Sequence, residues 1–76
     1  MKAQSKARAD LKAIGARIRQ LRGAMHQEHL AEYLAISQGQ LSKIERGRMA
    51  PTAETLARLA EKFGESMDWI VQGNRG

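Results

Sequence analysis

The sequence predicts a compact all-α domain of five helices. Apolar residues recur at helical spacing along most of the chain, and residues that favour helix ends separate these stretches. At 76 residues the chain can build only one modest core. It has no cysteine, which excludes a disulfide framework and a thiolate metal site and suits a reducing cytoplasm. No apolar run is long enough for a signal peptide or a membrane span.

A first helix is indicated by an apolar stripe that begins at residue 11. Its members are Leu11, Ile14, Ile18 and Leu21. Arg22 lies on the flank of this stripe, which predicts its partial burial. The ten residues before the stripe are rich in Ala and Lys, and they can fray, extend the first helix or act as a basic arm. We therefore expect an N-terminal arm over residues 1–10, a domain over 11–73 and a tail over 74–76.

A short second helix is expected over residues 27–34. Leu30, Ala31 and Leu34 form its apolar stripe, and a helix of this length needs packing to be stable. His26 stands at the N-cap position, where it caps more weakly than Ser or Thr. The small Ala31 either allows another helix to cross closely, as in a helix-turn-helix, or is simply a good helix former.

The third helix carries the functional argument. Ser37 followed three residues later by Gln40 is a capping-box pair, which predicts a helix from Gln38 to Arg46. Leu41 and Ile44 share its inner side with the stem of Gln40. The outer side has no apolar side chain; its members are Gln38, Gly39, Ser42, Lys43 and Arg46.

Such an outer face suits the major groove of DNA. Gln pairs with adenine, Lys with guanine and Ser with bases or phosphate, and Gly39 allows close approach to the groove wall. The same face also suits an ordinary solvated helix, so its neighbours decide between the two interpretations.

The last third of the chain predicts two further helices. Thr52 is expected to cap the fourth helix and Gly64 to end it. Ser66 and Gly73 are expected to bound the fifth helix in the same way. The expected buried stripe of the fourth helix is Leu56, Leu59, Ala60 and Phe63. On the fifth helix Met67, Trp69 and Ile70 suit the core, although part of that surface can instead pair with a second copy across a two-fold axis.

Residues 14–73 resemble the lambda-repressor-like (Xre-type) helix-turn-helix family. The resemblance runs through five segments in order: IGARIRQLR, QEHLAEYLAIS, QGQLSKIERG, PTAETLARLAEKFG and ESMDWIVQG. It implies a five-helix DNA-binding domain whose recognition helix starts at Gln38 and bears the base-contacting residues Gln38, Gly39, Ser42 and Lys43.

The resemblance also assigns three residues outside that face. Gln27 matches a position that holds a DNA phosphate. Arg22 and Glu45 match a pair that usually forms a partly buried salt bridge, although the connection from Arg22 to Gln27 is shorter than is common in the family. Ala35 stands where the family usually has glycine, so the turn is either strained or differently shaped.

Positive charge gathers near the expected recognition helix. Residues 1–22 carry seven basic residues and one acidic residue, whereas residues 51–76 carry three basic and four acidic residues. Such a distribution favours DNA along the first half and leaves the second half for protein contacts. Lys12, Arg17 and Arg19 lie opposite the apolar stripe of the first helix, where they either contact phosphate or only aid solubility. The expected phosphate contacts are Gln27, Gln40, Arg46, Arg48, Arg17 and Arg19.

Enzyme and metal functions have weak support. His26, His29 and Glu32 follow one helical edge, but their spacing is not that of a known zinc motif and nothing else converges on them. The chain has no glycine-rich phosphate loop and no nucleophile elbow. We therefore expect no catalysis, no cofactor, no metal and no small-molecule effector.

The sequence thus predicts a bacterial or phage-type transcriptional regulator that binds double-stranded DNA in the cytosol or nucleoid. We expect a homodimeric repressor that reads an inverted repeat. Two alternatives stay open. One is an antitoxin or a restriction-system controller on the same fold, with a toxin as a possible partner. The other is a protein-interaction module that binds DNA only incidentally.

Overall fold

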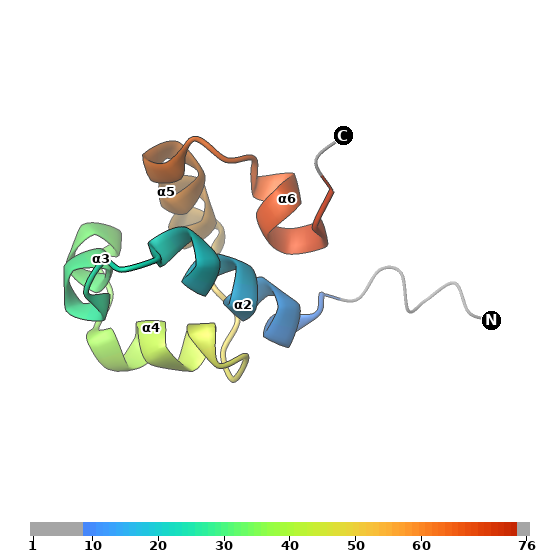
Figure 1. The fold of residues 1–76 in the computed structure, drawn as a ribbon. Coiled ribbons are helices and arrows are strands. Elements are labelled where there is room, and N and C mark those ends of the chain that lie inside the picture. The colour runs from blue at the N-terminus through green and yellow to red at the C-terminus, as the bar shows by residue number, and fades with distance from the viewer. Residues whose placement is uncertain (1–8, 75–76) are drawn as a thin grey trace.

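The computed structural model describes residues 9–74 and contains five helices in that range, with no strand (Figure 1). They are α2 (Leu11–Arg22), α3 (Gln27–Leu34), α4 (Gln38–Glu45), α5 (Ala53–Phe63) and α6 (Met67–Gln72). The all-α, five-helix prediction is confirmed. Of the arm expected over residues 1–10, residues 1–8 lie outside the described residues, as do residues 75 and 76 of the expected tail.

Side chains cap four of the five helices at their N-termini. Asp10 accepts a hydrogen bond from the Ala13 backbone N–H at 3.1 Å and so starts α2. The predicted caps Ser37, Thr52 and Ser66 each accept from the backbone N–H three residues later. His26 makes no side-chain cap for α3, as expected from its residue type. Local chemistry therefore sets most helix boundaries.

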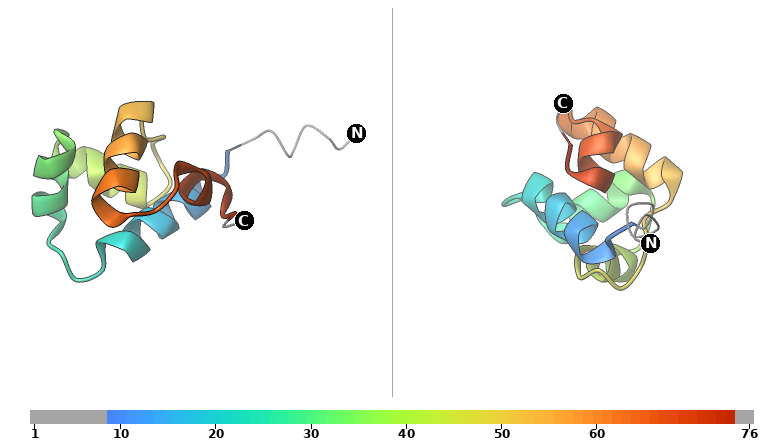
Figure 2. Two further views of the ribbon diagram at one scale, coloured as in Figure 1. Left: turned by 90° about the horizontal axis from the view of Figure 1, so that it is seen from above. Right: turned by 90° about the vertical axis from the view of Figure 1, so that its right-hand side faces the viewer.

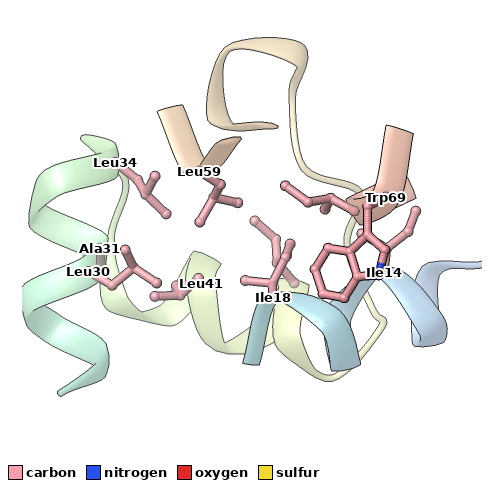
Figure 3. Close-up of a cluster of buried hydrophobic side chains, with 10 residues drawn as sticks. Ile14, Ile18, Leu30, Ala31, Leu34, Leu41, Leu59 and Trp69 are labelled. Atoms are coloured by element: carbon pink, nitrogen blue, oxygen red, sulfur yellow. The ribbon is translucent and has the colours of Figure 1, made fainter. Parts of the chain in front are cut away.

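The core draws on every helix. Five side chains are fully buried, one from each helix: Ile18, Leu30, Leu41, Leu59 and Ile70. Figure 3 shows the buried side chains converging between α2, α3 and α4 on one side and the C-terminal helices on the other. Burying a side chain of this size stabilises the fold by about 1.5–3 kcal/mol. Helices this short depend on that shared burial, because isolated helices of their length are unstable in water.

The C-terminal helices pack largely as expected. On α5 Leu59 is fully buried, and Leu56, Ala60 and Phe63 are partly buried against the core. The sequence argument overlooked Thr55, which is 3% exposed. On α6 Trp69 and Ile70 are 7% and 0% exposed. The expected burial of Trp69 and Ile70 in the core is confirmed, and the alternative that these two residues form a dimer surface is wrong, because the core of the same chain already covers them. Met67, at 39% exposed, is the one of the three left at the surface.

The turn between α3 and α4 is strained at Ala35. This residue has φ 61° and ψ 39°, the left-handed conformation expected of the glycine that usually occupies the position. Its N–H still closes α3 by donating to the carbonyl of Glu32 at 3.1 Å. The turn therefore keeps its shape without glycine.

Replacing Ala35 by Gly is expected to raise the free energy of unfolding by about 1 kcal/mol, because glycine removes the steric cost of a positive φ. Thermal unfolding followed by circular dichroism measures the effect. The matched control is Ala24→Gly at an exposed alanine whose φ is not positive, where a small loss is expected. Equal losses in the two variants would contradict strain at Ala35.

Candidate nucleic-acid interface

Helix α4 lies at one edge of the molecule, and α2 separates it from α6 (Figures 1 and 2). Its inner residues Leu41 and Ile44 are 0% and 3% exposed. The outer residues Gln38, Gly39, Lys43 and Arg46 are exposed, and Ser42 is half-buried. The structure thus brings the predicted base-contacting residues together on one outward face.

The first turn of α4 is fixed by the predicted capping box. Ser37 Oγ accepts from the Gln40 backbone N–H at 3.0 Å, and Gln40 Oε1 accepts from the Ser37 N–H at 2.9 Å. This pairing engages the carbonyl oxygen of Gln40 and leaves its amide nitrogen to donate outward. The capping box is therefore confirmed. Because the carbonyl oxygen of Gln40 is occupied, only its amide nitrogen is available to contact DNA.

Helix α2 holds the other end of α4 at Gly15. An ideal Cβ on Gly15 would lie 2.3 Å from the carbonyl oxygen of Ile44 and 2.6 Å from that of Glu45. Only glycine permits this approach of two helix backbones. The sequence argument did not single out Gly15, because a buried glycine inside a helix looks like an ordinary unfavourable helix residue.

The loop after α4 also packs on α2. Gly47 has φ 77°, and an ideal Cβ there would lie 2.8 Å from Cα of Lys12. This contact brings the first turn of α2 beside Arg46 and Arg48, which are both exposed. The three basic residues Lys12, Arg46 and Arg48 therefore belong to one surface next to the outer face of α4.

A partly buried ion pair joins α2 to the end of α4. Arg22 Nε donates to Glu45 Oε2 at 2.7 Å, and Arg22 Nη2 donates to Glu45 Oε1 at 3.0 Å. The two side chains are 15% and 4% exposed. Arg22 Nη1 also donates to the carbonyl of Met25 at 2.7 Å and so closes the short connection between α2 and α3. The expected salt bridge is present despite that short connection.

The carboxylate of Glu45 stabilises the charged form of Arg22. The hydrogen bonds that Arg22 donates to Glu45 raise the pKa of Arg22 above its ordinary value, and the attraction between the two charges adds to this effect. Burial acts in the opposite direction and does not cancel the rise. Arg22 therefore stays charged at any pH at which the protein would be studied.

The ion pair continues into the outer face of α4. Gln27 Nε2 donates to Glu45 Oε1 at 3.0 Å, and Gln38 Nε2 donates to Gln27 Oε1 at 3.3 Å. A hydrogen-bond chain thus runs from Arg22 through Glu45 and Gln27 to Gln38. The sequence argument paired Arg22 with Glu45 but missed the contact of Gln27 with both Glu45 and Gln38, because these residues are far apart in the chain.

Arg17 lies elsewhere. Its Nη1 donates to the carbonyls of Ile70 and Val71 at 2.9 and 3.3 Å, at the C-terminal end of α6. The prediction placed Arg17 on a free polar side of α2. That placement was wrong, because the guanidinium is hydrogen-bonded on the side of α2 that packs against α6. Arg19 is exposed, as a phosphate contact requires.

The described residues give no support to a metal site or a membrane span. The rings of His26 and His29 meet edge to face, with centroids 5.5 Å apart. Within residues 9–74, no three histidine, cysteine or acidic side chains gather closely enough to hold a metal ion. No helix in the same range has the length and apolar character needed to cross a membrane.

Comparison with protein families matches residues 16–70 to the family described as helix-turn-helix. No match is found among curated protein sequences. Among solved structures, the P22 c2 repressor protein in complex with a synthetic operator superposes with a TM-score of 0.74 at 28% identity. That alignment covers 80% of this chain and 96% of the repressor.

Two further structures are similar. The clp gene regulator ClgR from Corynebacterium glutamicum has a TM-score of 0.70 at 34% identity, over 78% of this chain and 65% of ClgR. The restriction-modification controller protein C.AhdI from Aeromonas hydrophila has a TM-score of 0.69 at 25% identity, over 80% of this chain and 91% of C.AhdI.

An outward polar helix held by two others in a helix-turn-helix defines the class: this is a DNA-binding transcriptional regulator. The family match extends over most of the chain and the fold agrees with it throughout. The chain belongs to the lambda-repressor-like helix-turn-helix family.

Proposed function

We propose that the protein is a homodimeric repressor that inserts α4 into the major groove and reads an inverted-repeat operator. The observation that carries this proposal is the outer face of α4, which is polar, exposed and held from behind by α2 and α3. In a helix-turn-helix the N-terminal residues of the second helix contact base edges. Two copies would place these helices about 34 Å apart, so the half-sites should repeat about one turn apart.

Gln38 is proposed to read adenine. One of its amide N–H groups donates to Gln27, which leaves its carbonyl oxygen and its second N–H for a base. Adenine presents the matching pair in the major groove, with N6 as donor and N7 as acceptor. Lys43 is proposed to donate to guanine, and Ser42 to contact a base edge from its half-buried position.

Phosphate contacts are proposed to come from residues near both ends of α4. Arg46, Arg48 and Lys12 form the basic surface at its C-terminal end. Gln27, at the start of α3, and the amide nitrogen of Gln40 are proposed to donate at its N-terminal end. Arg19 is proposed as a more distant contact. Such contacts give affinity that falls steeply with salt, whereas base contacts give preference.

Lys43→Ala and Gln38→Ala are each expected to relax preference at one base position per half-site, by about 1–3 kcal/mol. Selection from a random duplex library at about physiological salt, followed by sequencing, measures this preference. The control is Lys62→Ala, which removes one exposed positive charge on α5 and should leave the selected sequence unchanged. If wild type enriches no sequence at all, the protein-interaction alternative replaces this proposal.

Arg48→Ala is expected to weaken binding to all duplexes alike and to reduce the salt dependence of binding by about one unit of slope, because one phosphate contact is lost. Titration of fluorescent duplexes at several salt concentrations measures the slope. Arg58→Ala on α5 serves as the control, with no change in slope expected. A loss confined to the selected operator would contradict a phosphate role for Arg48.

The biological setting is also part of this proposal. We place the protein in the bacterial cytosol or nucleoid, without catalytic activity of its own. The similarity to the controller protein C.AhdI favours control of a restriction system as the second candidate setting. A repressor and a restriction-system controller would use the same contacts with DNA, so an enriched inverted repeat would support either function.

A further inference from the structure

The two histidines of the chain lie side by side at the start of α3, and the proposed DNA contacts do not include them. His26 stands immediately before the helix, and His29 belongs to its first turn. Their rings are in edge-to-face contact, and both residues are exposed. Histidine is the side chain whose charge changes near neutral pH. This pair is therefore a place where proton binding and DNA binding can be linked.

His26 occupies the N-cap position of α3 without capping the helix through its side chain. Its backbone carbonyl accepts from the N–H groups of His29 and Leu30 at 3.1 and 3.2 Å, but its ring makes no hydrogen bond to the first turn. The N-cap side chains of the other four helices all make such a bond. Serine or asparagine would cap α3 better. The stability of the helix therefore does not account for histidine at this position.

The next residue, Gln27, shows where His26 lies relative to the recognition helix. Gln27 Oε1 accepts from Gln38 Nε2 at 3.3 Å, so the start of α3 lies beside the start of α4 (Figure 1). When the second helix of a helix-turn-helix lies in the major groove, the first helix crosses the DNA backbone. A side chain at the start of α3 is therefore placed to meet a phosphate group.

The charges around His26 provide no anionic partner from the chain itself. The charged and titratable groups on the elements around it are Arg22 of α2, Glu28, His29 and Glu32 of α3, and Glu45 of α4, whereas Arg58 and Lys62 of α5 contact the other end of α3 at Tyr33. Glu45 is already engaged by Arg22 and Gln27. Within residues 9–74, neither histidine forms an ion pair. A phosphate would therefore be the first anion to pair with a protonated His26.

We propose that His26 contacts a DNA phosphate in its protonated form, so that DNA binding takes up a proton and becomes stronger as the pH falls. The inference rests on the proposed function, since it needs α4 in the major groove. A protonated imidazole donates a charge-assisted hydrogen bond to a phosphate oxygen, whereas the neutral ring brings no positive charge. By linkage, the proton raises the affinity for DNA by the same factor by which DNA raises the affinity for the proton. One proton is expected rather than two, because charges on adjoining rings repel.

The test measures affinity for the selected operator and for an unselected duplex at about pH 8 and about pH 6, at one ionic strength. Wild type should bind both duplexes about ten-fold more tightly at the lower pH, the size of one charge-assisted hydrogen bond. The salt dependence should become steeper by about one unit of slope, because one more phosphate is contacted. Calorimetry in two buffers of different ionisation enthalpy should show net proton uptake on binding.

Two substitutions fix the charge at position 26. His26→Asn keeps a side chain suited to the N-cap and does not titrate, so it should bind at both pH values as wild type does at about pH 8. His26→Lys is positively charged at both pH values and should bind as wild type does at about pH 6. The matched control is His29→Asn, which removes the neighbouring histidine and should keep the pH dependence of wild type. Thermal unfolding of each variant at both pH values shows that the affinities refer to folded protein.

The outcomes separate this inference from the proposed function. A selected operator that wild type binds equally well at both pH values would overturn the inference alone. Full pH dependence in His26→Asn would also overturn it, as would loss of the pH dependence in His29→Asn with His26 intact. If wild type selects no operator, the proposed function fails together with the inference.

Discussion

Replacing Gly15 by Ala is expected to lower the free energy of unfolding by about 3 kcal/mol. The new methyl group would overlap the carbonyl oxygens of Ile44 and Glu45, which are backbone atoms and cannot rotate away as a side chain would. A loss of this size corresponds to a fall of roughly 12–24 °C in the unfolding temperature of a domain this small. Chemical and thermal unfolding followed by circular dichroism measure both quantities.

Gly39→Ala is the matched control for this experiment, because it makes the same substitution inside a helix where the added group meets open space. It should leave stability unchanged or raise it. If Gly15→Ala unfolded at the temperature of wild type, α2 would not approach α4 as closely as the structure shows. Such a result would also remove the support that α2 gives to the recognition helix.

Arg22→Ala is expected to cost about 3 kcal/mol as well, for a different reason. It leaves the carboxylate of Glu45, which is 4% exposed, without its cationic partner. Removing one member of a buried pair is costly because the remaining carboxylate has lost its hydration and keeps only the neutral hydrogen bond from Gln27 in place of its cationic partner. The effect should appear in thermal unfolding and should exceed any loss of DNA affinity measured where the variant is still folded.

The exposed pair Arg58 and Glu54 provides the comparison. Arg58 Nη2 lies 2.8 Å from Glu54 Oε2, but the side chains of Arg58 and Glu54 are 41% and 74% exposed. Arg58→Ala should therefore cost less than about 0.5 kcal/mol. Unchanged melting of Arg22→Ala combined with lost DNA binding would instead assign Arg22 to the DNA surface.

Linkage predicts how the arginine affects stability across the pH range. The pKa of Arg22 is higher in the folded protein than its ordinary value, so its contribution is complete below that ordinary value. The contribution disappears only as the pH rises through the folded pKa, under strongly alkaline conditions. The difference in stability between wild type and Arg22→Ala should therefore not vary through deprotonation of Arg22 near neutral pH.

Local chemistry explains which parts of the fold were predictable. Ser37, Thr52 and Ser66 cap helices through backbone groups three residues away, so short sequence windows contain the whole interaction. The apolar stripes give the inner faces for the same reason. The turn at Ala35 was predictable only as one of two alternatives, strained or differently shaped, and the positive φ of Ala35 shows that it is strained.

Contacts between distant segments explain the rest. Gly15 meets Ile44 and Glu45 only after folding, and nothing near Gly15 in the sequence announces that contact. Arg17 was assigned to DNA because a helical wheel shows which side of α2 is polar and not what packs on it. Trp69 and Ile70 were ambiguous because an apolar face indicates burial without naming the partner.

The hydrogen-bond chain from Arg22 to Gln38 has a consequence for retargeting this domain to new operators. Lys43 is exposed and lies outside this hydrogen-bond chain, so it can be randomised in a library without disturbing the core. Gln38 is tied through Gln27 to Glu45, so new residues at position 38 should be selected together with new residues at position 27. Engineered variants and natural divergence should then both show position 38 changing in step with position 27, while position 43 varies independently.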